Sequence, residues 1–387
     1  MKKIRDKEVA LVLGDGAGPE MMAGACDIVV KAAMKYGLNI IFEETPMGWN
    51  AYEKYGDTLP AQSLCRAVEL GAVFFGGVGD PKWDNTVGVE KPAMKPEARC
   101  LLALRKEMWL LQNFRPMIYY KELDYLANVR PETIPEQGIQ QVWNRFLLED
   151  SYFGNEDLGP NFSKIARKTF GIKLKKEVTG EELVVSDIAF YRRETIEKYA
   201  RAAFVYARSA GLPVISIDKS NVMARYVLWR KVVTKIGKEE FPDVPLSHQL
   251  VDSANALLFT PALLHGVIIC GNEHGDILSD GAAGALGSMG MMCSSAINPD
   301  TGAAMFESGA GTAPTLRGLN KANPIGRVLT GAMMLRHFRC PEGANDIEQA
   351  VRSTLRDGYR TGDLLAGSSS GKLIGTREMS EEIMKRL

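Results

Sequence analysis

Short apolar runs alternate with helix-length segments along most of this chain. The runs have the length and bounds of buried strands, and they read EVALVLG (8–14), NIIFEE (39–44), AVFFGG (72–77), PVISID (213–218) and GVIICGN (266–272). The segments between them are typical of helices, and the clearest are 20–37, 194–211 and 221–237. Because strands and helices follow one another in turn, the sequence predicts an α/β layered fold.

The length of the chain predicts more than one lobe. With 387 residues, it exceeds the size at which one hydrophobic core normally stops growing, although one continuous sheet could still join two lobes. The strand–helix rhythm breaks from about Ile118 to Tyr191, where prolines recur and residues 173–191 resemble a hairpin followed by a strand. We expect this segment to belong to a second lobe, where it could also contribute to a subunit interface.

Composition and charge exclude several classes of protein. Hydrophobic residues make up 45% and charged residues 24%, which is ordinary for a globular chain. Lys+Arg and Asp+Glu both number 47, so no global charge favours nucleic acid or an anionic membrane as partner. The six cysteines are scattered without a CxxC pair, which indicates reduced thiols. The first apolar run is too short for a signal peptide or a membrane span, so we expect a cytoplasmic protein.

The stretch LVLGDGAGPE (11–20) resembles a dinucleotide-binding loop without completing the pattern. Gly14 and Gly16 fit the first two glycines, but Pro19 occupies the third position. Proline suits the first turn of a helix, and Glu20 complements the positive end of the helix dipole. The stretch therefore predicts a tight strand-to-helix turn, and it leaves open whether the turn borders an active site or only supports the architecture.

Two carboxylates follow the last of the apolar runs. Asp276 and Asp280 lie four residues apart, hence on one face if the segment is helical. Their mutual repulsion would be relieved by a divalent cation with oxygen ligands, Mg²⁺ or Mn²⁺. The alternative is that Asp276 caps the helix and Asp280 is solvated. His274 lies close by, but without a second histidine at ligand spacing we expect it to be a pocket or loop residue rather than a zinc ligand.

Three arginines suggest an anionic ligand. Arg105, Arg115 and Arg145 would suit a substrate with two carboxylates if they converge, because a guanidinium binds a carboxylate through two parallel hydrogen bonds. The spacing alone equally fits arginines that merely solvate helices.

Several long motifs, taken together, resemble the β-decarboxylating dehydrogenases, the family of isopropylmalate, isocitrate, homoisocitrate and tartrate/D-malate dehydrogenases. The motifs are GDGAGPE (14–20), DSYFG (150–154), ISIDKSNVMA (215–224), HQLVD (248–252), GDILSD (275–280) and ESGAGTAPTLRGLNKANP (307–324). The resemblance extends from Gly14 to GYRTGDL (358–364). It implies the two-lobed α/β fold of that family, not a Rossmann fold, with a cofactor-binding lobe at 1–110 and 287–387 and a substrate, metal and dimerisation lobe at 111–286.

The resemblance also implies roles for the charged residues. It makes Asp252, Asp276 and Asp280 the metal ligands, with Asp252 supplied by the partner subunit of a homodimer that shares its active sites. It makes Lys219 the base, Tyr152 the acid, and Arg105, Arg115, Arg145 and Asp252 contacts of a 2-hydroxy diacid. The sequence between Arg145 and Tyr152 lacks the RE-x-TGG motif that is usual in the family.

The cofactor implied by the resemblance is NAD⁺, and NADP⁺ stays open. The residues expected to contact it are Glu97, Asn272, Glu307, Gly311, Thr312, Ala313 and Asn323. Ala310 stands where the family usually has a histidine, and Thr315 stands where NAD-using isopropylmalate enzymes carry an aspartate. An aspartate there would repel the 2′-phosphate of NADP⁺, and Arg317 could attract it.

Among the subfamilies, GDPKWDN (79–85) and PEARCLLALR (96–105) most resemble bacterial isopropylmalate dehydrogenases. The resemblance predicts the oxidative decarboxylation of 3-isopropylmalate, with Leu101, Leu102 and Val222 around the isopropyl group. D-malate or tartrate, homoisocitrate and isocitrate are alternative substrates. A catalytically silent regulatory or binding paralogue is an alternative of another class.

Overall fold

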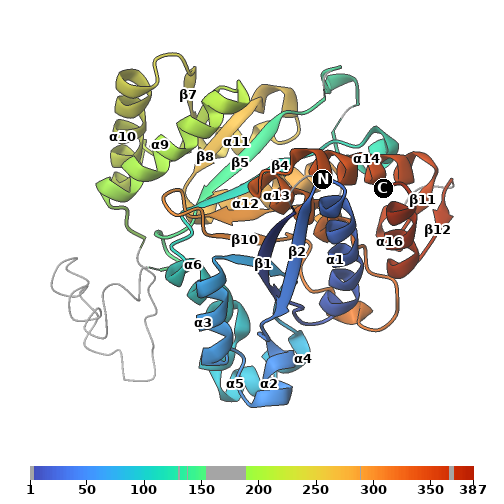
Figure 1. Cartoon of the computed structure of the whole chain (residues 1–387). Coiled ribbons are helices and arrows are strands. Elements are labelled where there is room, and N and C mark those ends of the chain that lie inside the picture. The colour runs from blue at the N-terminus through green and yellow to red at the C-terminus, as the bar shows by residue number, and fades with distance from the viewer. Residues whose placement is uncertain (1–3, 130, 137, 154–188, 288, 366–369) are drawn as a thin grey trace, which may run out of the picture.

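A single mixed β-sheet runs through the molecule in the computed structural model, which describes residues 4–129, 131–136, 138–153, 189–287, 289–365 and 370–387 (Figure 1). Within these residues the sheet has ten strands in the order β2-β1-β3-β10-β9-β4-β5-β8-β6-β7. The strands are β1 (Arg5–Val12), β2 (Leu38–Glu44), β3 (Ala72–Phe75), β4 (Gln112–Met117), β5 (Gln141–Phe146), β6 (Val214–Asp218), β7 (Leu246–Leu250), β8 (Gly266–Cys270), β9 (Ser295–Ile297) and β10 (Ala304–Glu307).

The strand directions divide this sheet into two parallel halves. Strands β2, β1, β3 and β10 are mutually parallel, and so are β5, β8, β6 and β7. Strands β9 and β4 connect the halves through antiparallel pairs with β10, with each other and with β5. This order and mixture of directions differ from the all-parallel doubly wound sheet of a Rossmann fold, as the sequence predicted.

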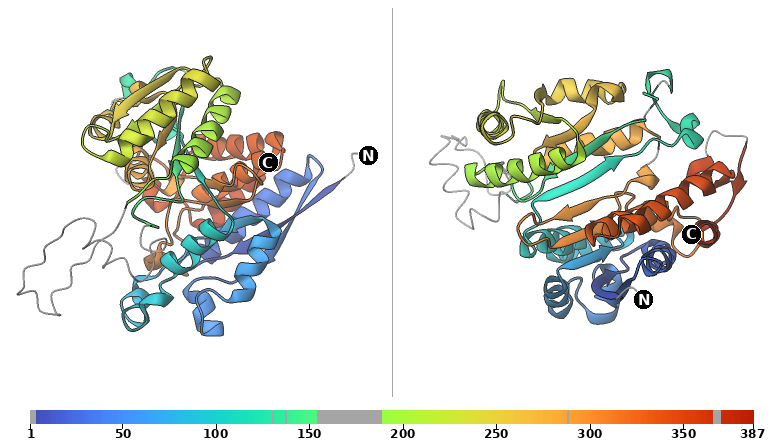
Figure 2. Two further views of the ribbon diagram at one scale, coloured as in Figure 1. Left: turned by 90° about the vertical axis from the view of Figure 1, so that its left-hand side faces the viewer. Right: turned by 45° about the horizontal axis from the view of Figure 1, so that its top comes forward.

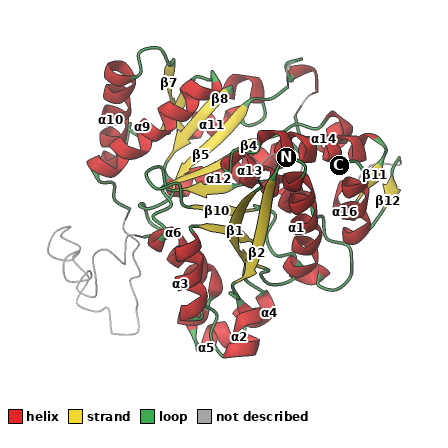
Figure 3. Ribbon diagram, viewed as in Figure 1, coloured by secondary structure: helices red, strands yellow, loops and turns green. Residues whose placement is uncertain are grey.

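Helices cover both halves of the sheet (Figures 2 and 3). Helices that surround the first half are α1 (Gly18–Met34), α2 (Trp49–Tyr55), α3 (Ala61–Leu70), α4 (Pro81–Asp84), α5 (Val87–Glu90), α6 (Leu102–Glu107), α13 (Ile325–His337), α14 (Pro341–Arg356), α15 (Gly362–Leu365) and α16 (Thr376–Lys385). Helices of the second half are α9 (Arg193–Ala210), α10 (Ala224–Glu240), α11 (Val251–Leu257) and α12 (Asn272–Ala285). A small ribbon pairs β11 (Tyr359–Arg360) with β12 (Lys372–Leu373).

Each half of the sheet has its own hydrophobic core. Helices α1, α13 and α14 pack against β1, β3 and β10 around buried residues such as Phe74 and Leu329. Helices α9 and α10 pack against β6 and β8 around residues such as Phe204 and Trp229. The structure is thus two-lobed with one continuous sheet, while the exact lobe boundaries at 110/111 and 286/287 remain a prediction.

The five apolar runs all form strands, namely β1, β2, β3, β6 and β8, and the three helical segments form α1, α9 and α10. Pro19 and Glu20 occupy the first turn of α1, as expected. The predicted hairpin at 173–185 lies outside the described residues.

All six cysteines lie in the described part, and none of them forms a disulfide. No helix of the described residues is both long and apolar enough to cross a membrane, and the expected cytoplasmic location stays a prediction.

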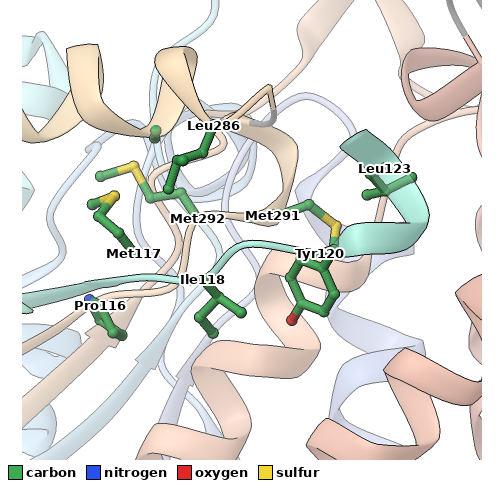
Figure 4. Close-up of a pocket in the computed structure, with 9 residues that line it drawn as sticks. Pro116, Met117, Ile118, Tyr120, Leu123, Leu286, Met291 and Met292 are labelled. Atoms are coloured by element: carbon green, nitrogen blue, oxygen red, sulfur yellow. The ribbon is translucent and has the colours of Figure 1, made fainter. Parts of the chain in front are cut away.

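A small cavity lies at the edge of the first core, next to the apolar residues that α12 packs against β4 (Figure 4). It measures about 20 Å³ and lies between the end of β4 and the segment after α12, among side chains that include Met117, Ile118, Leu286 and Met292. No charged side chain lines it. Because its lining is apolar and its volume suits at most a single small group, we regard it as an imperfection of core packing rather than a ligand site.

Candidate active site

A larger cleft of about 450 Å³ opens between the two halves of the sheet. Its walls come from the loops after β3 and β10, from the turn that leads into α6, and from β4, β5 and α12. The residues that line it are Gly77, Val78, Glu97, Ala98, Leu101, Leu102, Arg105, Arg115, Arg145, Tyr152, Asp276, Asp280, Ser294, Glu307, Ser308, Gly309, Gly311 and Thr312. Twelve of them are residues that the sequence singled out, so distant motifs converge on one site.

The glycine turn at the N-terminus lies directly behind this cleft. The Asp15 amide donates to the carbonyl of Gly77 at 3.0 Å, and the Ala17 amide donates to the carbonyl of Thr312 at 2.8 Å. Gly14 has φ 80°, and a Cβ there would lie 2.0 Å from the carbonyl oxygen of Gly77. The turn therefore supports two loops of the cleft wall from behind, which decides the question that the sequence left open.

The side chain of Asp15 links this turn to neighbouring segments of the first lobe. Its buried carboxylate accepts hydrogen bonds from the backbone amides of Trp49, Asn50 and Gly79 at 3.0, 2.9 and 2.8 Å. Burial raises the pKa of Asp15, and the three amides oppose that rise. One side chain thus joins three loops of the first lobe.

The three arginines converge on the cleft from two strands and a helix. Arg115 lies on β4 and donates to Asp276 at 3.0 Å and to Asp280 at 2.8 Å. Arg145 lies on the neighbouring β5 and also pairs with Asp276. Arg105, on α6, lies 3.9 Å from the carboxylate of Glu307. All three are buried, so the interpretation as solvated helix arginines is excluded.

The arginine cluster crowds three guanidinium groups into a buried place, although Asp276, Asp280 and Glu307 lie against them. Burial, followed by the charges of Arg105 and Arg115, lowers the pKa of Arg145 to about 9, and burial lowers the pKa of Arg105. A guanidinium keeps its proton inside proteins. The lowered pKa values therefore indicate that burial and the neighbouring guanidinium groups disfavour the positive charge on each of these arginines. Among the described residues, Nη2 of Arg145 and Nε of Arg105 are buried without a hydrogen-bond partner. An anionic ligand would supply acceptors for these two nitrogens.

Asp276 and Asp280 lie one turn apart on α12, as the spacing predicted. Burial raises the pKa of Asp276, but Arg145 and Arg115 outweigh it, so its net pKa is lowered. Burial dominates at Asp280 and raises its pKa despite the opposing Arg115. Among the described residues, no three His, Cys, Asp or Glu side chains of this one chain are grouped closely enough to hold a metal ion.

Asn272 has a different role from the cofactor contact that we expected. Its side chain is fully buried at the start of α12. Its carbonyl oxygen accepts a hydrogen bond from Nε of Arg145 at 2.9 Å, and its amide donates to the carbonyls of Leu147 and Glu149. Asn272 therefore orients Arg145 from behind and does not face the cleft.

Tyr152 lies on the cleft wall beside the carboxylates. Its hydroxyl donates to Oδ2 of Asp276 at 3.0 Å, and the guanidinium of Arg145 lies 5.2 Å from the centre of its ring. Desolvation, followed by the charge of Asp276, raises the pKa of Tyr152. A raised pKa keeps the hydroxyl protonated, which suits a proton donor.

Lys219 and Asp252 lie outside the cleft of their own chain. Lys219 follows β6 and Asp252 begins α11 after β7, so these parallel neighbours bring both to one edge of the sheet. The two side chains form an ion pair, and that hydrogen bond lowers the pKa of Asp252. Val222, expected in the substrate pocket, is 69% exposed. These three residues do not line the cleft that holds Asp276 and Tyr152.

One wall of the cleft is apolar. Leu101 ends a single turn of π-helix (Glu97–Leu101), and Leu102 begins α6 directly after it. Val78 and Ala98 complete this wall. Glu97 stands at its edge, where desolvation and then the charges of Asp84 and Glu307 raise its pKa.

The expected cofactor loop is partly where it was predicted. Glu307, Gly311 and Thr312 line the cleft, and the Thr312 hydroxyl donates to the carbonyl of Gly79 at 2.9 Å. Ala313 has φ 44° and packs against Ala17 rather than lining the cleft.

Three further side chains of that loop correct or refine the expectation. Asn323 is buried, and its amide donates to Asp363 at 2.9 Å, so its side chain is not directed into the cleft. Thr315 and Arg317 are exposed on the same loop.

His274 is neither a loop residue nor a cleft residue, which corrects our expectation. It lies in the first turn of α12, with Nδ1 2.7 Å from the hydroxyl of Tyr226 and its ring stacked on that tyrosine. Burial lowers its pKa.

The sequence did not single out several residues of the cleft wall, among them Gly77, Val78, Ser294, Ser308 and Gly309. Gly77 and Val78 directly follow β3, which lies among parallel strands. Ligands of open α/β sheets bind beyond the carboxyl ends of such strands. The glycines at the end of AVFFGG could therefore have predicted that the residues after this strand line the site.

Comparison with known proteins agrees with this geometry. Residues 8–383 match a sequence profile described as isocitrate/isopropylmalate dehydrogenase. The chain is 37% identical to a 3-isopropylmalate dehydrogenase of Geobacillus kaustophilus, covering 97% of this chain and 94% of the relative. It is 36% identical to one from Desulfotalea psychrophila, with 98% and 100% covered. The crystal structure of isocitrate dehydrogenase from Methylococcus capsulatus superimposes with a TM-score of 0.78 at 29% identity, covering 98% of this chain and 99% of that one.

Proposed function

The chain belongs to the isocitrate/isopropylmalate dehydrogenase family and is a decarboxylating dehydrogenase, and we propose that it converts 3-isopropylmalate to 4-methyl-2-oxopentanoate, a reaction of leucine biosynthesis. The observation that carries the proposal is the cleft in which three buried arginines and two aspartates face an apolar wall. The relatives from Geobacillus kaustophilus and Desulfotalea psychrophila are both named 3-isopropylmalate dehydrogenase, after this substrate.

The arginines would hold the two carboxylates of the substrate. Arg145 and Arg115 already share Asp276, and Nη2 of Arg145 and Nε of Arg105 have no partner within the part of the chain that the structure describes. A diacid would complete these hydrogen bonds with charged acceptors, which are the strongest partners for guanidinium groups. The same contacts would relieve the crowding of positive charge.

The apolar wall favours a hydrocarbon substituent on the diacid. Leu101 and Leu102 offer no hydrogen bond from their side chains, and Ala98 and Val78 extend the same surface. The third carboxylate of isocitrate, if placed there without a partner, would cost several kcal/mol. An isopropyl group instead gains from leaving water.

A divalent cation fits the chemistry of the two aspartates, provided that a second chain contributes. Asp276 and Asp280 present carboxylate oxygens from one helix face, the ligand type that Mg²⁺ and Mn²⁺ prefer. This chain alone lacks a third acidic ligand among its described residues, and Asp252 of a second copy would supply it. When bound, the cation polarises the hydroxyl oxygen of the substrate and the nicotinamide accepts the hydride.

Two side chains would move the protons. Lys219 of a second copy would accept the proton of the substrate hydroxyl. Tyr152 would donate a proton to the carbon from which the carboxylate departs, and its raised pKa keeps that proton available. Asp276 orients this tyrosine through their 3.0 Å hydrogen bond.

A homodimer with shared active sites would bring these groups together. Large apolar side chains are exposed on the segments of the second lobe that follow β6, β7 and β8, namely Val222, Val227, Phe259, Leu263 and Ile277. Apolar exposure that gathers into one patch marks interaction surfaces. Val222 could then reach the isopropyl pocket of the other chain.

NAD⁺ is the cofactor that we propose, with NADP⁺ open. Glu97, Glu307, Gly311 and Thr312 line the same cleft as the arginines. Thr315 carries no charge that would repel a 2′-phosphate, and Arg317 is exposed nearby.

Purified protein can be tested with Mg²⁺ or Mn²⁺, either nicotinamide cofactor, and 3-isopropylmalate, isocitrate, homoisocitrate, D-malate or tartrate. We expect reduced cofactor and CO₂ to form fastest with 3-isopropylmalate, and we expect a chelator to abolish the reaction until Mg²⁺ or Mn²⁺ is restored. A clear preference for another acid would overturn the substrate assignment, and no reaction with any pair would favour a silent paralogue.

A further inference from the structure

The loop that carries Tyr152 begins at a residue with an unusual backbone. Asp150 has φ 79°, in the left-handed region that side chains other than glycine rarely adopt. It is also fully buried. Aspartate tolerates this conformation better than most residues, but a buried carboxylate needs partners to remain charged.

The Asp150 carboxylate has such partners on several sides. It accepts hydrogen bonds from the Tyr191 hydroxyl at 2.6 Å and from the Ser151 amide at 3.1 Å. A guanidinium nitrogen of Arg225 lies 3.6 Å away. The left-handed backbone is therefore held by its own side chain.

The same carboxylate contacts the start of α12. The Glu273 amide donates to Oδ2 of Asp150 at 3.4 Å, and a carboxylate at a helix N-terminus is favoured by the helix dipole. Gly271, just before the helix, makes room for this contact, because a Cβ there would lie 2.0 Å from the Tyr191 hydroxyl. Asp150 thus joins the Tyr152 loop to the helix that carries Asp276.

The turn that follows Asp150 presents Tyr152 to the cleft. The Phe153 amide donates to the Asp150 carbonyl at 3.4 Å, which closes a turn with Tyr152 inside it. The Tyr152 hydroxyl then reaches Asp276 at 3.0 Å. Two links therefore connect the loop with α12, one through Asp150 at the base and one through Tyr152 at the tip.

We propose that Asp150 is a positioning residue, which fixes the hydroxyl of Tyr152 relative to Asp276 by tying the loop to the N-terminus of α12. The proposal rests on the proposed role of Tyr152 as proton donor. Asp150 does not line the cleft, so it acts only through the loop.

The first test needs neither substrate nor metal. A fluorinated tyrosine is placed at position 152, and its fluorine NMR signal is compared in the parent, Asp150→Gly and Asp150→Asn. Glycine accepts φ 79° but lacks the carboxylate, whereas asparagine accepts that φ and keeps one side-chain oxygen acceptor. We expect the signal to move toward that of a solvent-exposed tyrosine in Asp150→Gly and to stay closer to the parent in Asp150→Asn.

The second test is kinetic. Asp150→Gly should lower kcat roughly 10- to 100-fold, as expected for a misplaced catalytic group, with little change in KM for the hydroxy acid. Asp150→Asn should restore much of the loss. Val351→Ala, which shortens a buried side chain in the other lobe, serves as a control for lost stability alone and should keep the parental kcat and fluorine signal.

A parental fluorine signal in Asp150→Gly would overturn the proposal, and so would a fall in kcat without any change in that signal. If Asp150→Gly does not fold, Tyr191→Phe removes the 2.6 Å hydrogen bond to Asp150, together with the 3.2 Å hydrogen bond to the Tyr226 hydroxyl, and carries the same two tests. An inactive parent enzyme would refute the proposed function, whereas the fluorine comparison would still decide whether Asp150 positions Tyr152.

Discussion

One guanidinium nitrogen of Arg145 pairs with Asp276, while Nη2 of the same side chain is buried with no hydrogen-bond partner among the described residues of segments 4–153 and 189–387. The Nη1 nitrogen of the guanidinium thus contacts α12, and the Nη2 nitrogen is available to a ligand. Asn272 holds Nε at 2.9 Å, so the orientation of the fork is fixed before any ligand arrives.

Arg145→Lys should therefore damage substrate binding more than its retained charge suggests. An ammonium cannot contact Asp276, Asn272 and a carboxylate in one plane. We expect kcat/KM for the diacid to fall roughly 100-fold or more, measured from initial rates at saturating metal and cofactor.

The matched control is Arg201→Lys on α9. Arg201 makes a two-nitrogen contact with Glu240 on the surface, with its side chain 46% exposed. Surface ion pairs contribute little to stability, so this variant should keep parental rates. Equal losses in both variants would contradict the role of Arg145.

Leu102→Gln tests the apolar wall. A polar amide in this wall should reduce kcat/KM for 3-isopropylmalate roughly 10- to 100-fold, because the isopropyl group then packs against an unsatisfied polar group. D-malate lacks that group, so its rate should change much less. Leu373→Gln, at a side chain 64% exposed in β12, is the control. A uniform loss with both acids would place the isopropyl group elsewhere.

The parts of the fold that the sequence predicted are those whose pattern is local. AVFFGG and GVIICGN form β3 and β8 because continuous apolar runs suit strands buried on both faces. Strand β4 reads QNFRPM, in which Gln112, Asn113 and Arg115 are buried yet polar. The partners of Asn113 and Arg115 lie on α12 and in the segment before β9, so nothing within the strand itself marks it as buried. Strands β9 and β10 are too short to show a period.

The site was predictable to a similar degree. Spacing placed Asp276 and Asp280 on one helix face, and the family motifs named the arginines that meet them. The orientation of amides was not predictable, because it depends on contacts distant in sequence. Asn272 turns toward Arg145 and Asn323 toward Asp363, although both lie in motifs that suggested cofactor contacts.

Shared active sites predict recovery of activity from two damaged proteins. Lys219→Met and Arg145→Lys homodimers should each be nearly inactive. Hybrid dimers contain one site in which both residues are intact and one in which both are changed, so purified hybrids should have about half of the parental activity and an unfractionated random mixture about a quarter. The hybrids can be produced by co-expression with two affinity tags and assayed after sequential purification. Absence of recovery, or full activity in a proven monomer, would contradict shared sites.

Thr315→Asp should increase the preference for NAD⁺. The new carboxylate on the exposed loop would repel a 2′-phosphate, so kcat/KM with NADP⁺ should fall roughly 10-fold or more relative to NAD⁺. Thr301→Asp places the same charge on an exposed threonine in the turn before β10 and should leave the cofactor ratio unchanged. An unchanged ratio in Thr315→Asp would mean that this loop does not approach the adenosine ribose.

The free energy of unfolding should fall as the pH drops below 6.5, in part because of His337. Burial lowers the pKa of His337 from 6.5, and its Nε2 lies 2.9 Å from the carbonyl of Gly302. The unfolded chain accepts a proton near 6.5, whereas the folded protein accepts it only at lower pH. The stabilisation is thus complete above that value and is lost as the pH falls toward the folded pKa.

His337→Gln keeps a hydrogen-bond donor but does not titrate, so it should lack this part of the loss. Urea denaturation of both proteins across this range measures the difference. Buried carboxyl groups such as Asp15 are common to both proteins, so their contributions cancel in that difference. The parent should lose its advantage over His337→Gln as the pH falls through the window below 6.5. Parallel curves for the two proteins would show that the imidazole takes up its proton equally well in the folded and unfolded chains.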